Sequence, residues 1–284
     1  MVVIGIDIGG TEIKAGRVKK GIITKVIKKK TKSHVSTEIF LEELFKIIDK
    51  LFHKDVKYIG IGVPGLVDEK IGVIRSLTNI PSLHNVPLKR IIEKKYDRPV
   101  FIDNDAACFV LGEKHFGKAK KYKNVVGLIM GTGAGAGVII NNKLYKGINS
   151  GAGEFGSIHY QHKKIEDYCS GKFFLWKYHI TGLQLFNKIT KRKRINHKAL
   201  KIFNEFGENI GQELSLVVNI LAPELIILGG SVANSYNFFK SEMFKTLKKE
   251  IPAAQYKRTK IKVSRRKYIA ILGASVLHKE FLKK

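Results

Sequence analysis

The sequence predicts an α/β fold built from two related lobes, and an internal repeat is the main reason. An apolar strand over residues 2–8 runs into Gly9-Gly10-Thr11 and a second strand, and residues 125–130 run in the same way into Gly131-Thr132-Gly133. A third apolar run ends in a cluster of acidic and amide side chains just before a helical pattern. Open α/β folds place their chemistry at such strand ends.

Composition indicates a soluble globular protein with a sizeable core. The chain has 284 residues, of which 44% are hydrophobic and 27% charged, which suggests one large or two ordinary domains. Two unpaired cysteines favour a reducing compartment, and no basic segment precedes the first strand as a signal peptide would require. Glycines interrupt the longest uncharged run, residues 124–142, which we interpret as a buried hairpin. We expect a cytoplasmic protein that does not enter the membrane.

The net charge is unusual. Lysine and arginine number 52 against 24 acidic residues, a formal charge of +28. A field of this sign attracts polyanions such as nucleotides, polyphosphate or nucleic acid. The basic clusters are dispersed and lack interleaved aromatics at a known motif spacing, so we expect no specific nucleic-acid binding. A solvated lysine-rich surface and a functional polyanion surface both remain open.

The first strand ends in a group of residues suited to phosphate and metal. Asp7 precedes Gly9-Gly10-Thr11, and Lys14 follows in the next strand. Bare glycine amides allow a ligand to approach the backbone, and a carboxylate suits a metal ion. The alternative is an ordinary glycine hairpin turn.

Residues 22–99 are predicted to complete the first lobe. Residues 22–27 form a strand, and the apolar spacing over residues 39–51 predicts a helix that packs on the core. Residues 58–63 form a further strand that ends in the turn Pro64-Gly65. A short helix begins at Ile91.

The predicted strand at residues 100–102 is followed by Asp103, Asn104 and Asp105, and then by a predicted helix that ends at Gly117. An acidic strand end favours catalysis. Asp and Asn are also favoured caps of any helix, so Asp103 or Asn104 is a candidate cap.

The second half repeats this organisation. Residues 150–160 are glycine-rich and contain Glu154 and His159, and a helical run begins at Glu166. One apolar face predicts a long helix over residues 203–221, ended by Pro223.

The buried strand 225–228 runs into Gly229-Gly230, which we interpret either as a ligand contact or as close helix–strand packing. The last apolar helix covers residues 269–281. We expect residues 1–117, joined by the C-terminal segment 269–284, to form the small lobe, and residues 118–268 the large one.

With these motifs assembled, the chain resembles the ROK family of sugar kinases and regulators along nearly its whole length. The matching segments are Asp7-Ile8-Gly9-Gly10-Thr11 with Lys14, Val63-Pro64-Gly65, Asn79 with Pro81, Asn104-Asp105-Ala106, Gly131-Thr132-Gly133 with Gly135, Gly153-Glu154-Phe155-Gly156 with His159, Glu166, and Leu228-Gly229-Gly230. The resemblance implies the actin-like, duplicated ribonuclease-H-type fold, two α/β lobes around a cleft. It also implies phosphoryl transfer from ATP to a hexose hydroxyl, with glucose and its 6-hydroxyl ranked first.

The resemblance also assigns roles residue by residue. Asp105 matches the general base that takes the proton of the attacking hydroxyl. The residues matching the sugar pocket are Gly65, Asn79, Asn104, Asp105, Glu154, His159 and Glu166. Those matching the nucleotide site are Asp7 with Mg²⁺, Gly9, Gly10, Thr11, Lys14, Thr132 and Gly133 at the phosphates, and Gly229 and Gly230 near adenosine.

One departure concerns zinc. Most family members carry a cysteine-rich zinc loop between the residues matching His159 and Glu166, but only residues 160–165 separate them here, without cysteine. A structural zinc site needs about four ligands, so we expect none. Some members without this loop use polyphosphate, which stays the second donor after ATP.

The same motifs fit more than one function within the family. Mannose, fructose, N-acetylmannosamine and N-acetylglucosamine kinases share them. A sugar-sensing regulator of the family would need an N-terminal DNA-binding segment, for which a strand starting at Val2 leaves no room. A catalytically idle sugar- or polyanion-binding module is opposed by intact Asp7 and Asp105. The family also suggests a homodimer.

Overall fold

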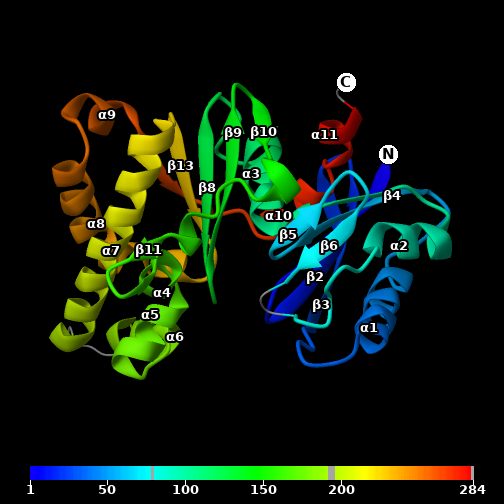
Figure 1. Cartoon of the computed structure of the whole chain (residues 1–284), viewed down its shortest axis with the longest axis horizontal. Helices are drawn as coiled ribbons and strands as arrows, with labels where there is room; N and C mark the ends of the chain where they lie inside the picture. The colour runs from blue at the N-terminus through cyan, green and yellow to red at the C-terminus, as the bar shows by residue number, and fades with distance from the viewer. Residues whose placement is uncertain (78–79, 191–195, 283–284) are drawn as a thin grey trace. The chain divides into compact units, whose positions relative to one another are not determined.

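The computed structural model describes residues 1–77, 80–190 and 196–282. By their contacts these divide into two compact units. The first comprises Met1–Lys121, Gly137–Ala152 and Arg265–Lys284, and the second comprises Tyr122–Ala136 and Gly153–Ser264. Each unit is described by itself below, with the element labels of Figure 1.

The first unit is built on a five-stranded mixed sheet in the order β3-β2-β1-β4-β7. Its strands are β1 (Val2–Ile8), β2 (Glu12–Lys19), β3 (Ile22–Lys30), β4 (Val56–Val63) and β7 (Val100–Asn104). β1 pairs antiparallel with β2 and parallel with β4, and β4 pairs parallel with β7. Parallel strands end at the same edge, so the polar residues that follow β1, β4 and β7 share one edge of this sheet.

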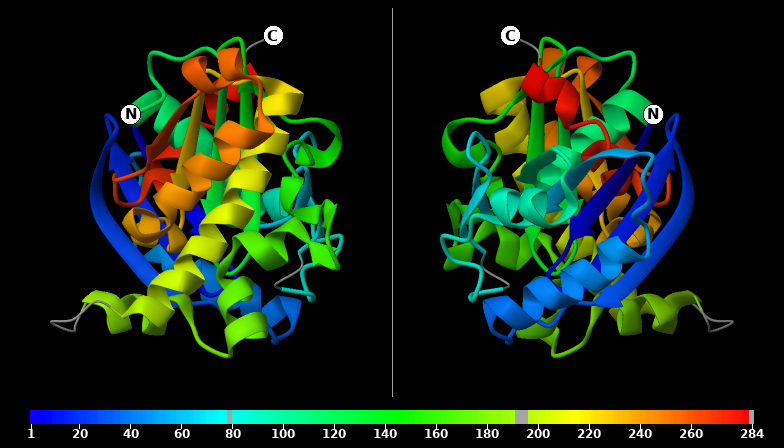
Figure 2. Two further views of the ribbon diagram at one scale, coloured as in Figure 1. Left: turned by 90° about the vertical axis from the view of Figure 1, so that its left-hand side faces the viewer. Right: turned by 90° about the vertical axis from the view of Figure 1, so that its right-hand side faces the viewer.

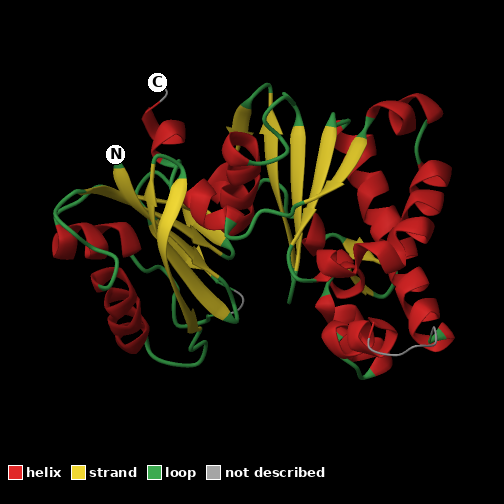
Figure 3. Ribbon diagram, turned by 180° about the vertical axis from the view of Figure 1, so that it is seen from behind, coloured by secondary structure: helices red, strands yellow, loops and turns green. Residues whose placement is uncertain are grey.

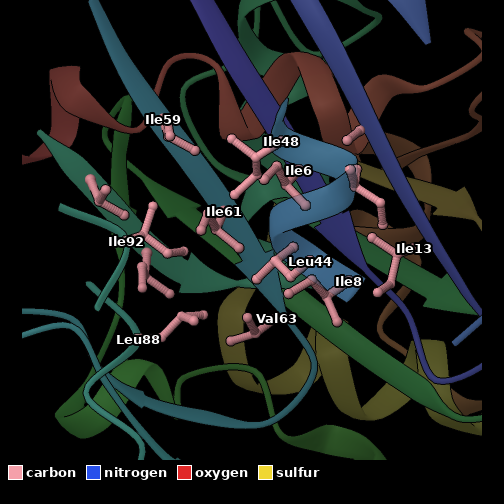
Figure 4. Close-up of a cluster of buried hydrophobic side chains, with 14 of the residues drawn as sticks. Ile6, Ile8, Ile13, Leu44, Ile48, Ile59, Ile61, Val63, Leu88 and Ile92 are labelled. Atoms are coloured by element: carbon pink, nitrogen blue, oxygen red, sulfur yellow. The ribbon is translucent and has the colours of Figure 1, made fainter. Parts of the chain in front are cut away.

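Alternation along these strands separates two faces of the first sheet. One face carries Ile6, Ile61 and Ile102, which pack against α1 (Thr37–Asp49) and α2 (Leu88–Tyr96) in a buried cluster. Figure 4 shows this cluster, with Leu44 of α1 and Leu88 and Ile92 of α2 among the strand side chains. Burying such aliphatic side chains contributes roughly 1.5–3 kcal/mol each.

The opposite face packs on α3 (Asp105–Phe116) and α10 (Ile269–Ala274). Glycines in the strands make this approach possible. A Cβ on Gly5 would lie 2.2 Å from the Ile271 carbonyl oxygen, and one on Gly60 would lie 1.9 Å from that of Ala274. The backbone of α10 therefore lies directly on β1 and β4.

The remaining elements of the first unit are short. They are β5 (Leu66–Asp68), β6 (Val73–Ser76), η1 (Ile148–Ser150), α11 (His278–Leu282) and β10 (Lys143–Tyr145), which pairs within the second sheet. The sequence predicted one helix over residues 269–281, but the chain forms α10 and then α11. Ser275 ends α10, and its hydroxyl donates to the Leu272 carbonyl at 2.7 Å.

The second five-stranded sheet has the order β10-β9-β8-β13-β14. Its strands are β8 (Val125–Met130), β9 (Ala134–Ile140), β10 (Lys143–Tyr145), β13 (Leu225–Gly229) and β14 (Lys260–Val263). β13 pairs parallel with β8 and with β14. The turn after β8 is limited to residues 131–133, because Gly135 and Gly137 belong to β9.

Helices form the rest of the second unit, and Figure 3 distinguishes them from the strands. They are α4 (Ile165–Cys169), α5 (Gly171–Tyr178), α6 (Gly182–Thr190), α7 (His197–Leu221), α8 (Tyr236–Glu250), α9 (Ala253–Arg258) and the turns η2 (Phe155–Ser157) and η3 (Val232–Ser235). α7 and α8 lie side by side (Figure 2). The two-stranded β11 (His159–Tyr160) and β12 (Lys163–Lys164) precede α4.

An aromatic cluster forms the core of the second unit. Phe174 of α5 packs its ring 4.8 Å from that of Phe206 on α7, and Phe206 lies 5.4 Å from Phe239 on α8. All three side chains are fully buried. The long helix predicted to end before Pro223 is confirmed as α7, whose last turn is capped by Ala222 in a left-handed conformation.

Candidate active site

The hairpin after β1 forms the tight turn expected from Gly9 and Gly10. The Gly9 N–H donates to the Glu12 carbonyl at 3.1 Å, and the Thr31 hydroxyl donates to the Gly9 carbonyl at 2.7 Å. Thr11 is exposed at the tip, and its carbonyl accepts from the Thr31 N–H at 3.0 Å. Thr31, the residue that follows β3, therefore holds the loop, while the glycines leave its backbone accessible.

Asp7 pairs with Lys14 across β1 and β2. Burial raises the pKa of the Asp7 carboxyl group to about 6, although the Lys14 ammonium opposes this shift. Lys14 is itself 3.7 Å from the Glu12 carboxylate. A second cation would stabilise the ionised form of Asp7, and an oxygen ligand of this kind would suit Mg²⁺.

Asp103, Asn104 and Asp105, at the junction of β7 and α3, make different interactions. Asn104 is the N-cap of α3, and its Oδ1 accepts from the N–H groups of Ala106 at 2.8 Å and Ala107 at 3.3 Å. Asp103 is fully buried, and its Oδ1 accepts from the Asn104 N–H at 2.8 Å. Asp105 is the first residue of α3 and is partly exposed. The cap expected somewhere in this segment is thus Asn104.

Gly65 lies beside this strand end. It adopts a φ of +107°, and the Asn104 side-chain amide donates to its carbonyl at 3.1 Å. In the strand register Asp7 is level with Gly62, and Gly62 with Asp103. The first unit therefore brings Asp7, Gly65, Asn104 and Asp105 to one edge of its sheet. Asn79 lies outside the described residues.

In the second unit, residues 131–133 form a hairpin turn that the start of α5 supports. The Gly131 N–H donates to the Gly133 carbonyl at 2.9 Å, and the Gly171 N–H donates to the Gly131 carbonyl at 2.8 Å. The Ser170 hydroxyl contacts the Thr132 carbonyl at 3.3 Å. Thr132 itself is exposed.

Glu166 lies directly against this turn. A Cβ on Gly133 would be 2.8 Å from Glu166 Oε2, and the Lys172 ammonium donates to Oε1 at 2.7 Å. Desolvation raises the pKa of Glu154 and the nearby Glu166 adds to the effect, while Ser157 and Lys164 oppose it. The second unit thus groups Glu154, Glu166 and the Gly131–Gly133 turn.

His159 and the two terminal glycines complete the second unit's candidates. His159 is exposed on β11, where it pairs with Lys164. Gly229 ends β13 level with Ile129 of β8, so Gly229 and Gly230 share the sheet edge of the Gly131–Gly133 turn. Gly230 has a φ of +83° and lies against the Met130 carbonyl.

Two ion pairs at the site were missed by sequence reasoning. Lys146 lies 3.0 Å from Asp103, and Lys172 lies 2.7 Å from Glu166. Lys172 is the second residue of α5 and lies only six residues after Glu166, so their proximity could be inferred from the sequence. Lys146 is 43 residues from Asp103, and no local pattern links them.

The described residues contain no group of three or more His, Cys, Asp and Glu placed to hold a metal ion. The absence of zinc stays a prediction. Within the same ranges, none of the helices has the length and apolar character needed to span a bilayer.

Comparisons with known proteins agree with these motifs. The sequence model described as "ROK family" matches residues 3–280. An N-acetyl-D-glucosamine kinase of Pectobacterium atrosepticum is 29% identical over 302 residues, which covers 96% of this chain and 98% of that protein. A xylose repressor of Caldicellulosiruptor bescii is 28% identical over 270 residues, covering 81% of this chain and 67% of that protein.

A solved structure extends the comparison to the fold. The crystal structure of a ROK family glucokinase from Streptomyces griseus, in complex with glucose and AMPPNP, aligns with a TM-score of 0.81 at 25% identity. The alignment covers 98% of this chain and 99% of that one. The predicted α/β class and its actin-like duplicated fold are confirmed.

Proposed function

Because the chain belongs to the ROK family, we propose that it is a sugar kinase that transfers the γ-phosphate of ATP to a hexose hydroxyl. The observation that carries the proposal is the strand end of β7. It places Asp105 at the start of α3, beside Asn104 and at the same sheet edge as Asp7. A general base, a polar anchor and a metal-binding carboxylate are what phosphoryl transfer to a hydroxyl requires.

In this mechanism the sugar hydroxyl attacks the γ-phosphorus as the bond to the leaving ADP oxygen breaks. Asp105 accepts the proton of the attacking hydroxyl. Asn104, Gly65, Asn79, Glu154, His159 and Glu166 are assigned to the sugar. The backbone of Gly9, Gly10, Thr11, Thr132 and Gly133 is assigned to the phosphates, with Lys14 nearby, and Gly229 and Gly230 to adenosine. Mg²⁺, held through Asp7 and the nucleotide, would neutralise phosphate charge.

We place glucose first among the acceptors, because the solved relative contains glucose. N-acetylglucosamine is a direct competitor, since a relative that covers nearly the whole chain is named for it. Mannose, fructose and N-acetylmannosamine complete the panel. Polyphosphate is the alternative donor, motivated by the net charge of +28.

The test crosses these five sugars with ATP and polyphosphate, each with and without Mg²⁺, and measures the phosphate transferred. We expect turnover with ATP, Mg²⁺ and one preferred sugar. Asp105→Asn should lower kcat by roughly 10²–10⁴-fold while sugar still binds. Asp97→Asn is the matched control, because the Asp97 side chain is exposed and ends α2 in a left-handed conformation that asparagine also adopts. Full turnover in Asp105→Asn would refute the assignment of the base.

A sugar-sensing regulator is the competing function, and the similarity to a xylose repressor motivates it. Salt-dependent binding of duplex DNA together with no phosphate transfer to any sugar would favour it. We further propose a cytoplasmic homodimer without zinc. Light scattering and elemental analysis of the purified protein test the dimer and the absence of zinc.

A further inference from the structure

The first unit contains a buried ion pair next to the proposed base. Lys146 follows β10, and its ammonium lies 3.0 Å from Oδ2 of Asp103. The Asp103 side chain is fully buried, and that of Lys146 is 17% exposed. Asp103 is two residues before Asp105.

Lys146 provides the charge that Asp103 needs. Oδ1 of Asp103 accepts the Asn104 N–H at 2.8 Å, whereas Oδ2 accepts no hydrogen bond from the described residues. The ammonium is therefore the partner of Oδ2 by charge. A buried carboxylate that loses its counter-charge is strongly disfavoured, and the chain around it rearranges or admits water.

Lys146 is itself held in place from the C-terminal helix. Its ammonium lies 3.9 Å from the ring centroid of Phe281 on α11. The Phe281 ring packs 5.3 Å from that of Phe101, which belongs to β7. Lys146 thus contacts both Asp103 of β7, the strand that precedes the proposed base, and Phe281 of α11, which packs on the same strand.

The contacts form one continuous path to the base. Phe281 holds Lys146, Lys146 pairs with Asp103, and Asp103 accepts from the backbone of Asn104. Asn104 caps α3, whose first residue is Asp105. A displacement of Asp103 would therefore shift the N-terminal turn of α3 and with it the carboxylate of Asp105. A displacement of about 1 Å is enough to cost roughly 10²-fold in rate.

We propose that Lys146 is a positioning residue for Asp105, acting through its ion pair with Asp103. The inference rests on the proposed function, because Asp105 is taken as the base. Lys146 touches neither sugar nor nucleotide in this assignment. Its loss should lower kcat, while the sugar KM, to which other residues contribute, changes little.

The kinetic test compares three variants of the full chain. Lys146→Met removes the charge at similar length, and we expect kcat to fall roughly 10–100-fold with the sugar KM within about threefold. Lys146→Arg keeps the charge and the contact with the ring, so its kcat should stay within about threefold of the wild type. Lys143→Met is the matched control, since Lys143 is exposed on β10. Equal losses in the Met and Arg variants, or wild-type kcat in Lys146→Met, would overturn the proposal.

A second measurement does not depend on turnover. Hydrogen exchange of the peptide containing Ala106 and Ala107 reports on the cap of α3. We expect about tenfold faster exchange there in Lys146→Met and wild-type exchange in Lys146→Arg and Lys143→Met. Unchanged exchange in Lys146→Met contradicts the proposal.

Phe281→Leu supplies a milder variant if Lys146→Met does not fold. It removes the ring beneath the Lys146 ammonium but keeps the ion pair with Asp103. Exchange of the Ala106–Ala107 peptide should therefore be faster than in the wild type, by a smaller factor than in Lys146→Met. Unchanged exchange would count against the proposal. If the wild type transfers no phosphate to any sugar, the proposed function fails. The exchange comparison then decides alone whether Lys146 holds this strand end.

Discussion

The side-chain amide of Asn104 donates a hydrogen bond to the Gly65 carbonyl at 3.1 Å, while the oxygen of the same side chain caps α3. One residue therefore joins the turn after β4 to the helix after β7. Asn104 is 8% exposed, so both interactions are shielded from water. Asparagine suits this position because its side chain offers a donor and an acceptor together.

Asn104→Ala should lower the free energy of unfolding by roughly 2–3 kcal/mol. About 1 kcal/mol comes from the lost cap, and the remainder from the unpaired Gly65 carbonyl. Ser36→Ala is the matched control, because Ser36 caps α1 through a bond at 3.4 Å and its other bond, to the Glu38 side chain, is local and does not join two distant segments. Urea denaturation of both variants measures the difference. Equal losses would mean that the bond to Gly65 contributes no stability.

Gly65→Ala should destabilise the protein by roughly 1–3 kcal/mol and raise the sugar KM. Gly65 has a φ of +107°, and a Cβ there would lie 2.4 Å from the Ser76 carbonyl oxygen. A non-glycine residue in this conformation is strained, and the contact forces the turn to shift. Gly131→Ala should remain within about 0.5 kcal/mol of the wild type, since nothing lies within 4 Å of a Cβ there. Thermal unfolding and sugar titration check both, and a stable Gly65→Ala with normal KM would refute the strain argument.

Glu213 on α7 should make stability depend on pH. Its side chain is 1% exposed, and burial raises its pKa from 4.5 to about 7, with a hydrogen bond from Cys169 opposing the shift. Between these two values the unfolded chain ionises Glu213 and the folded chain does not. The stability from this group is therefore complete below pH 4.5 and is lost as the pH rises through 7.

Glu213→Gln should therefore be more stable than the wild type by roughly 3 kcal/mol at pH 8, and nearly equal to it at pH 4. Urea denaturation of both proteins at the two pH values measures how the difference in their free energies of unfolding changes with pH. Glu208→Gln, on the exposed face of the same helix, is the matched control for the substitution itself. A constant offset for Glu213→Gln at both pH values would contradict the shift.

Much of the fold was readable because its signals are local. The apolar runs that became β1, β8 and β13 are long enough to identify strands, and the spacing in residues 203–221 identified α7. The glycine turns followed from residue type alone. The break between α10 and α11 was missed, because a continuous apolar pattern does not reveal where a helix packed against the sheet will end.

For the candidate site, the sequence by itself determined which residue types gather at the strand ends: Asp7 near the end of β1, Asn104 at the end of β7 with Asp105 next to it, and the glycines at the ends of β8 and β13. Strand length and hydrophobicity are local properties, so the polar residue at the end of a strand is visible in one dimension. Only the tertiary structure decided how Asp103, Asn104 and Asp105 divide their tasks. That division depends on partners distant in the chain, the Gly65 carbonyl for Asn104 and the Lys146 ammonium for Asp103. A buried polar group takes the partner that folding brings within about 3 Å, and this choice has no local signature.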